Sequence, residues 1–135
     1  MTQYLIDTSI WVFFLRKQVG IGKRIEAAGR NNCFISEISL AELRFGAEKG
    51  SRTDESHRLI DELERDIQIL PVYDALRIYS KEKARLQKQG NPISDFDLLI
   101  GATALANNLT LVTHNVREFS RIEALTIEDW TLKQV

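Results

Sequence analysis

Short runs of consecutive apolar residues alternate along this chain with longer segments in which apolar residues recur every three or four positions. The short runs are typical of buried strands, and they predict strands at residues 4–6, 33–35, 67–72 and 109–113, with a last one within 117–130. The longer segments predict helices at residues 10–15, 21–30, 39–49, 54–66, 74–89 and 95–106. Strands that alternate with helices at this spacing predict an α/β fold, a three-layer sandwich in which a mainly parallel sheet of about four to five strands lies between helices.

Two details refine this pattern. Pro71 lies in the predicted strand 67–72, and because proline cannot donate a backbone hydrogen bond, this strand is expected at an edge of the sheet. The helix at 74–89 is expected to turn Leu76, Tyr79 and Leu86 toward the core.

Composition adds limits on size, partners and location. With 135 residues, 44% of them hydrophobic and 27% charged, residues 1–135 are expected to form one domain with a core of its own. The 18 basic and 19 acidic side chains nearly cancel, so a nucleic-acid partner would need a local basic surface or a metal ion. The single Cys33 excludes an internal disulfide. No signal sequence or long apolar run is present, which predicts a cytoplasmic protein without a membrane partner.

Three acidic residues stand where α/β proteins collect ligands. Asp7 directly follows the first strand, at the sheet edge where loops and helix N-termini converge. Asp97 falls in the first turn of the helix that begins near Ser94 and Asp95. Asp7 has a simpler explanation as a residue that only caps the following helix. The short strand before it favours neither a ligand-binding role nor a capping role. Thr8 and Ser9 are themselves expected N-caps of that helix.

Glu42 lies in a helix whose start is ambiguous. If Ser39 is the N-cap, Glu42 completes a capping box and only satisfies backbone donors. If the helix begins at Ser36 instead, Glu42 shares an otherwise apolar face with Ile38, Ala41 and Phe45. An ionised carboxylate on such a face is costly unless it has a partner such as a cation.

Convergence of Asp7, Glu42 and Asp97 would have a chemical consequence. Repulsion between carboxylates raises their pKa values unless a divalent cation neutralises them. Ligands that offer only oxygen favour Mg²⁺ or Mn²⁺ over zinc. Such a cation activates water for attack on a phosphodiester, so the three acids predict metal-dependent hydrolysis.

The local sequences around these acids resemble one family. Leu5-Ile6-Asp7-Thr8-Ser9, Ala41-Glu42-Leu43 with Gly46-Ala47, Pro92-Ile93 with Asp97-Leu98-Leu99-Ile100, and Val112-Thr113-His114-Asn115 with Glu118-Phe119 are similar, in order and spacing, to PIN-domain ribonucleases of the VapC toxin type. The resemblance implies a PIN-like fold and a Mg²⁺- or Mn²⁺-dependent endoribonuclease, with tRNA or another structured RNA as substrate. It also implies a homodimer and a VapB-type antitoxin that blocks the site, with DNA bound only through the antitoxin complex.

Site residues follow from the same resemblance. Asp7, Glu42 and Asp97 match the catalytic, metal-binding acids of the family. Asn115 departs from it, since many members hold a fourth acid there; an uncharged amide makes a second metal site doubtful.

Three more residues are predicted to be auxiliary. Thr8 and Thr113 match hydroxyl positions near the metal cluster of the family. Asp95 cannot share a helix face with Asp97, so it is expected to be a cap or rim residue, with direct contact to metal or water as the alternative.

Other assignments stay open. His114 is a proton shuttle or a structural residue. Trp11, Phe14 and Leu15 form an antitoxin groove, a dimer seam or ordinary core. A non-catalytic PIN-like module that acts through protein binding is the main rival to a nuclease, and cleavage of DNA as well as RNA is a further one. A phosphatase of the haloacid dehalogenase type fits less well, because Ser9 stands where its second aspartate belongs.

Overall fold

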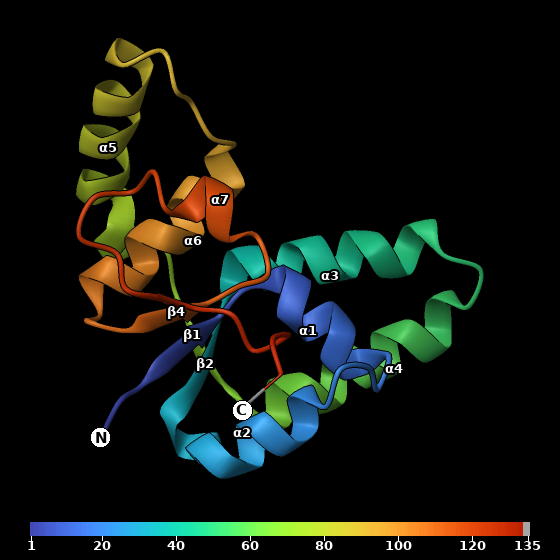
Figure 1. Ribbon diagram of the computed structural model, residues 1–135. Helices are drawn as coiled ribbons and strands as arrows, with labels where there is room; N and C mark the ends of the chain where they lie inside the picture. The colour runs from blue at the N-terminus through green and yellow to red at the C-terminus, as the bar shows by residue number, and fades with distance from the viewer. Residues whose placement is uncertain (134–135) are drawn as a thin grey trace.

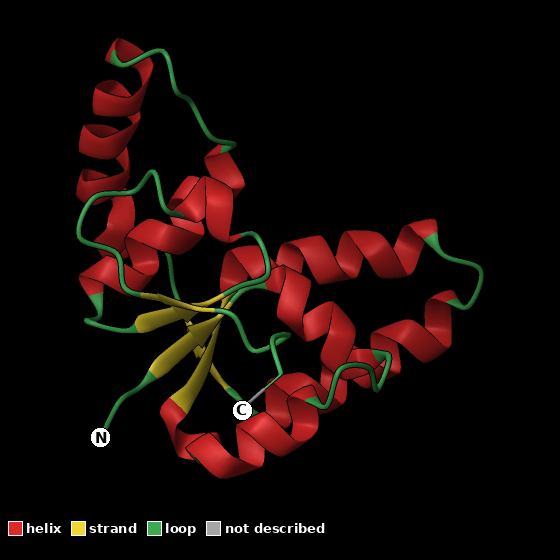
Figure 2. Cartoon of the chain, in the orientation of Figure 1, coloured by secondary structure: helices red, strands yellow, loops and turns green. Residues whose placement is uncertain are grey.

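One five-stranded sheet forms the centre of the computed structural model, which describes residues 1–133 (Figures 1 and 2). Every neighbouring pair of strands is parallel, in the order β3-β2-β1-β4-β5. The strand bounds are β1 Tyr4–Ile6, β2 Cys33–Ser36, β3 Gln68–Leu70, β4 Thr110–Val112 and β5 Ile127–Glu128. The predicted α/β class and parallel sheet are therefore confirmed, and β3 is an edge strand as Pro71 predicted.

Helices cover both faces of the sheet (Figure 1). Their bounds are α1 Thr8–Leu15, α2 Ile21–Ala28, α3 Glu37–Lys49, α4 Thr53–Asp66, α5 Leu76–Lys88, α6 Asp95–Ala106 and α7 Val116–Phe119, with 3₁₀ turns at Arg30–Asn32 and Tyr73–Ala75. Successive strand residues point to opposite faces and so enter two separate cores. Ile6 packs with residues of α1 to α4, whereas its neighbour Leu5 packs with residues of α5, α6 and α7.

Helices α3 and α4 form an antiparallel hairpin that extends away from the sheet (Figure 1). Arg44 of α3 joins the two helices, because its guanidinium lies 2.7 Å from Asp61 and 3.2 Å from Glu64 of α4. The same guanidinium donates to the carbonyl oxygen of His57. Arg44 therefore ties α3 to α4 at a point two residues after Glu42.

Two predicted helix starts are resolved by their caps. Helix α1 begins at Thr8, and Asp7 rather than Thr8 or Ser9 is its N-cap, since the Asp7 carboxylate accepts from the Thr8 amide. Helix α3 is capped by Ser36, whose hydroxyl accepts from the Ile38 amide. The capping box from Ser39 to Glu42 is therefore absent, and Glu42 is free for other contacts.

One prediction about exposure was wrong: Leu76 is 44% exposed and does not belong to the core, whereas Tyr79 and Leu86 pack in it as predicted. Phe45, on the face of α3 that the sequence indicated to be apolar, is 67% exposed. Helical periodicity identified their faces correctly but not which faces the neighbouring elements cover. Helix α7 was not predicted, because its four residues are too few to show a helical period. Within residues 1–133 no helix is both long and apolar enough to cross a bilayer.

Replacing Ser36 by alanine should lower the free energy of unfolding by about 1 kcal/mol, since the amide of Ile38 would lose its acceptor. Chemical denaturation followed by circular dichroism measures the change. Ser51→Ala, at an exposed position between α3 and α4, serves as the control and should have little effect. Equal losses for both variants would contradict the assignment of Ser36 as the cap.

Candidate metal centre

The carboxyl ends of β1 and β4 define the position of the site. These neighbouring strands lie at the centre of the sheet, and the chain leaves β1 toward β2 on one side and reaches β4 on the other. Ligands of open parallel sheets bind at such a switch point. Asp7 follows β1 there and Thr113 follows β4, and the Asp7 amide donates to the Val112 carbonyl at 2.8 Å.

Asp7 is the most buried acid of the site, with 4% of its surface exposed. One carboxylate oxygen accepts from the Thr8 amide at 2.7 Å, and the other accepts from the hydroxyls of Ser9 at 3.0 Å and Thr113 at 2.7 Å. Burial raises the pKa of Asp7, although these hydrogen bonds oppose the rise. Asp7 thus caps α1 and at the same time presents a desolvated carboxylate.

Glu42 is brought to Asp7 by the neighbouring hydroxyl of Thr8. Thr8 Oγ1 donates to Glu42 Oε1 at 2.7 Å and lies 2.8 Å from the hydroxyl of buried Ser39. Burial raises the pKa of Glu42, and the charge of Asp7 raises it further against the hydrogen bond from Thr8.

Asp97 completes the group from the first turn of α6. Its amide donates to the hydroxyl of Ser94, the N-cap of that helix, at 3.3 Å. The pKa of Asp97 is raised to about 6, first because burial desolvates the carboxylate and then because Asp7 repels its charge, with smaller contributions from Glu42 and Glu118. The three predicted acids therefore sense one another's charge.

These side chains fit a hard divalent cation by their chemistry. All of the ligand atoms that they offer are oxygens. Burial raises the pKa of each carboxylate, and the charge of Asp7 adds to the rise at Glu42 and Asp97, which is a cost that a cation relieves. As the side chains of residues 1–133 stand, however, no three acids, histidines or cysteines are close enough together to enclose an ion. Asp7 and Glu42 are each held by hydroxyl donors, so direct coordination would require these hydrogen bonds to rearrange.

The predicted auxiliary residues divide into two groups. Thr8 and Thr113 contact the acids, as described above. Asn115 is exposed, and its backbone N–H donates to Thr113 Oγ1 at 2.9 Å. Asp95 is turned toward α5, where its carboxylate accepts from Tyr79 and Lys83, each at 2.8 Å.

His114 lies beside the site. Its amide lies 3.3 Å from the hydroxyl of Ser9, and its ring contacts Thr131 and Asp129 near the end of the chain.

Glu118 was missed as a site residue by the sequence reasoning. It lies in α7, three residues after Asn115, and its charge contributes to the raised pKa of Asp97. A signal was present, because Glu118 belongs to the last of the local sequences that carried the family resemblance. The chain thus has an amide at Asn115, where many members of the family hold an acid, and a carboxylate at Glu118, three residues further on.

Comparisons with known proteins agree with this architecture. The model of the PIN domain matches residues 4–125. Ribonuclease VapC2 of Rickettsia felis is 34% identical over 130 residues, which are 94% of this chain and 97% of the relative. The tRNA(fMet)-specific endonuclease VapC of Shigella flexneri is 32% identical over 133 residues, which are 97% of this chain and 100% of the relative.

Solved structures give the same result. VapBC2 from Rickettsia felis, bound to a DNA fragment from its promoter, includes a chain with a TM-score of 0.89 and 31% identity, covering 96% of this chain and 99% of that one. VapBC-1 from nontypeable Haemophilus influenzae gives a TM-score of 0.86 and 35% identity over 97% of this chain and 100% of that one.

The protein is thus a member of the PIN-domain family. Within that family it belongs to the VapC-type ribonucleases, the toxins of VapBC toxin–antitoxin systems. The fold and the ribonuclease function expected from the sequence motifs are confirmed by these matches.

Substitution of Asp97 by asparagine should stabilise the metal-free protein at neutral pH. The pKa of Asp97 is about 6 in the folded chain against 3.8 as a model value, so its favourable contribution is complete below about pH 4 and is lost as the pH rises through 6. Asp97→Asn should therefore raise the melting temperature near pH 7, by about 3–5 °C per kcal/mol relieved, and leave it unchanged near pH 4.

Thermal denaturation in chelator across this pH range measures the effect. Asp74→Asn, an exposed acid in the Tyr73–Ala75 turn, is the control and should not change the melting temperature at either pH. Equal melting temperatures of Asp97→Asn and the unmodified chain near pH 7 would show that the ionised, buried Asp97 does not destabilise the fold.

Proposed function

We propose that Asp7, Glu42 and Asp97 together hold a Mg²⁺ or Mn²⁺ ion at which this toxin hydrolyses RNA. The observation that supports this most strongly is the pKa of Asp97, raised to about 6 by burial and by the two other acids. Natural folds rarely keep several desolvated carboxylates together without a compensating charge. When bound, the ion would supply a water activated for attack on phosphorus and charge that stabilises the leaving oxygen.

The residues of the chain have distinct roles in this proposal. Ser9 and Thr113 orient the Asp7 carboxylate, and Thr8 fixes Glu42 beside it. Side chains that are already held close together lose less conformational entropy when an ion binds, even though the hydrogen bond from Thr8 to Glu42 must rearrange for direct coordination. Glu118 adds negative charge on the side of α7, which offsets the absence of an acid at Asn115.

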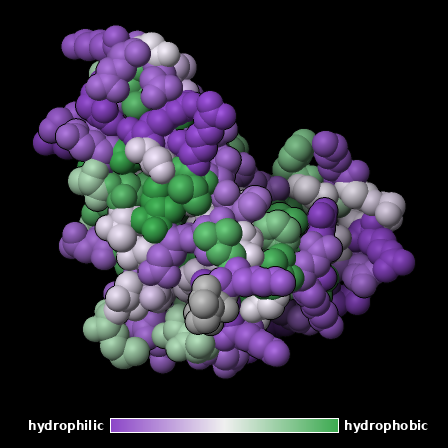
Figure 3. All heavy atoms as spheres, in the orientation of Figure 1, coloured by the Kyte–Doolittle hydropathy of each residue, from purple (hydrophilic) through white to green (hydrophobic). Residues whose placement is uncertain are grey.

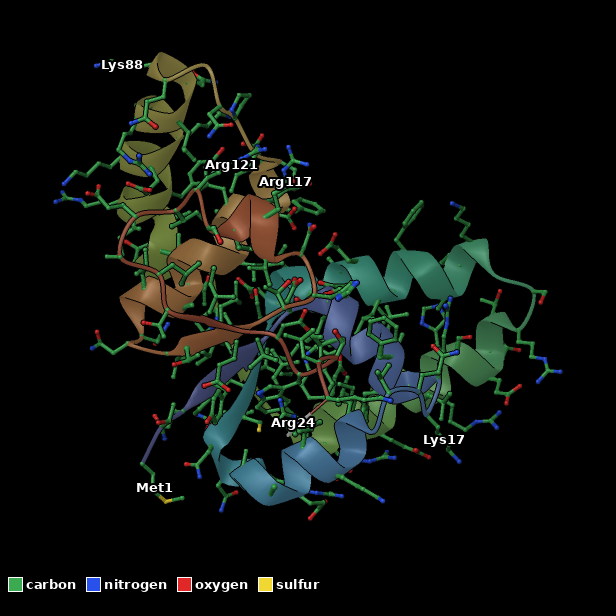
Figure 4. All side chains as sticks on the ribbon, viewed as in Figure 1. Met1, Lys17, Arg24, Lys88, Arg117 and Arg121 are labelled. Carbon is green, nitrogen blue, oxygen red and sulfur yellow. The ribbon has the colours of Figure 1, made fainter. Side chains whose placement is uncertain are left out.

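Transfer RNA is the proposed substrate. The relative from Shigella flexneri is named a tRNA(fMet)-specific endonuclease, and it aligns over nearly the whole of this chain. Arg117 and Arg121 of the α7 region lie beside the start of α6 and provide local positive charge near the acids (Figure 4). Phosphate contacts of this kind position an RNA backbone, whereas the selection of one tRNA depends on its shape and its unpaired bases. We place this activity in the cytoplasm, where tRNA is found.

Cleavage of purified tRNA by the antitoxin-free protein tests the assignment. With Mg²⁺ or Mn²⁺ we expect discrete products that chelator abolishes. Asp7→Asn keeps a residue able to cap α1 but removes the charge, and it should slow cleavage roughly 100-fold or more. Asp74→Asn should cleave normally.

Full cleavage by Asp7→Asn and Asp97→Asn would contradict the proposed centre. No cleavage by folded, antitoxin-free protein would favour a module that acts only through protein binding. Equal cleavage of matched DNA would extend the substrate to both nucleic acids.

We further propose a cognate antitoxin as the partner that occupies a groove between α1, α2 and α4. Solved structures of related chains are complexes of toxin and antitoxin, some with DNA, so DNA would be contacted through the antitoxin. The groove has a volume of about 530 Å³. Its apolar lining includes Phe14, Leu15, Ile21, Ile25, Leu59 and Leu63. Trp11 does not line this groove and is fully buried core.

A homodimer completes the proposed assembly. Ile69, Tyr73 and Leu76 are 40%, 77% and 44% exposed, and they follow one another from edge strand β3 into α5. An edge strand with exposed apolar side chains is a surface that natural proteins normally cover. A second copy would remove it from water.

Leu59 is 39% exposed in the groove. Leu59→Arg should weaken inhibition by the antitoxin at least about tenfold, because it places a charge among apolar side chains. Cleavage by the free toxin should not change, since Leu59 lies in α4, which carries none of the three acids. Titration of antitoxin into the cleavage assay measures both. Leu132→Arg, at an exposed residue outside the groove, is the control, and equal inhibition of both variants would place the antitoxin elsewhere.

A further inference from the structure

Two exposed phenylalanines lie close in sequence to acids of the site. Phe45 on α3 is 67% exposed and Phe96 on α6 is 48% exposed. Phe45 lies three residues after Glu42, and Phe96 directly precedes Asp97. Exposed aromatic residues are common singly, but here each is attached to an element that supplies one of the acids.

Helix α3 carries a mixed stripe that leads away from the acids. Positions 42, 45, 46 and 49 lie on one face of a helix, because residues three and four apart are neighbours on its surface. The stripe therefore runs from Glu42 past Phe45 and Gly46 to the exposed Lys49. No atom lies within 4 Å of where a Cβ of Gly46 would stand, so the backbone beside Phe45 is open.

On the opposite side of the site, α6 and α7 also carry an exposed aromatic ring and a cationic side chain. Phe96 is in the first turn of α6, and α6 contacts α7, which carries the exposed Arg117 (Figure 4). Between the part formed by α5, α6 and α7 and the hairpin of α3 and α4, the molecular surface is hollowed (Figure 3). An aromatic ring and a cation thus accompany the acids on both sides.

We propose that Phe45 and Phe96 are stacking platforms for unpaired bases of the RNA on either side of the scissile phosphate. This inference rests on the proposed function, which puts that phosphate at Asp7, Glu42 and Asp97. Aromatic rings bind bases of any identity through their π faces, and neighbouring cations hold the backbone between them. Because a base must leave its helix to stack in this way, the site takes single-stranded segments of a structured RNA, such as a loop.

Coverage of the two rings by a second copy of the chain is less consistent with their surroundings. A stable interface buries about 800 Å² on each partner, whereas a phenylalanine offers at most about 250 Å². Phe45 is next to Glu42 and near Lys49, and the charges on this stripe suit a polyanion held with a metal ion better than a hydrophobic seam. The more apolar set at Ile69, Tyr73 and Leu76 lies on other elements.

Binding of short, unstructured oligouridine tests the proposal directly. All proteins carry Asp97→Asn so that the RNA stays intact, and affinity is measured by fluorescence anisotropy. Matched oligonucleotides lack a single base at successive positions but keep the ribose and phosphate. We expect removal of a base at one or two positions to weaken binding about tenfold, the size of one stacking contact.

Variants of the rings identify which base each one binds. Phe45→Leu and Phe96→Leu keep an apolar side chain but lose the ring, and each should abolish the sensitivity to one missing base while leaving the others. Phe45→Tyr keeps a ring and should behave as the parent protein. Circular dichroism confirms that each variant is folded.

The outcomes separate this inference from the proposed function. The stacking role is overturned if removal of a base does not change the affinity of the parent protein. It is also overturned if removal of a base weakens binding by the same factor in the leucine variants, even when metal-dependent cleavage of tRNA is intact. A change of molecular mass in solution caused by Phe45→Leu would assign Phe45 to an interface between copies and also overturn it. Failure of tRNA cleavage itself concerns the acid centre and not the rings.

Discussion

Desolvation of acidic side chains at one end of a parallel sheet is the constraint on which the rest of the molecule depends. Asp7 is 4% exposed and has only hydroxyl and amide donors around it. Burial first, and then repulsion by Asp7, Glu42 and Glu118, raises the pKa of Asp97 to about 6. A fold that evolved only for stability would replace such residues, because burying like charges together is unfavourable. Their retention is understandable if the charge is needed for a cation and, through it, for phosphodiester chemistry.

The sheet supplies the geometry that this arrangement requires. Parallel strands bring their carboxyl ends to one edge, so Asp7 and Thr113, 106 residues apart in sequence, share a hydrogen bond. The three helices that carry or adjoin the acids each begin at a capping residue: Asp7 caps α1, Ser36 caps α3, and Ser94 caps α6. Each cap satisfies backbone amides that would otherwise be unpaired at a helix start. Secondary structure and site are therefore built from the same residues, with Asp7 serving both.

Much of this could be predicted from the sequence, and the exceptions have physical causes. The strands and long helices follow from periodicity, and the edge position of β3 follows from Pro71. The exposure of Phe45 could not be predicted, because periodicity assigns residues to a face but does not say what packs on it. Glu118 was missed because its distance from Asp97 depends on how α7 packs against α6. The cap of α3 was ambiguous because Ser36 and Ser39 can both cap a helix; in the fold Ser36 is the cap, and the hydroxyl of Ser39 instead makes a tertiary contact with Thr8 that the sequence does not reveal.

The most direct test of the account is a crystal structure of the antitoxin-free protein grown with Mn²⁺, in which anomalous scattering locates the ion. We expect an anomalous peak among the carboxylates of Asp7, Glu42 and Asp97, with the hydrogen bond from Thr8 to Glu42 rearranged. The same crystals of Asp97→Asn should lose the peak or show it much weakened. An ordered Mn²⁺ ion elsewhere, or none at these carboxylates at saturating metal, would contradict the claim that the buried charge is held for a cation.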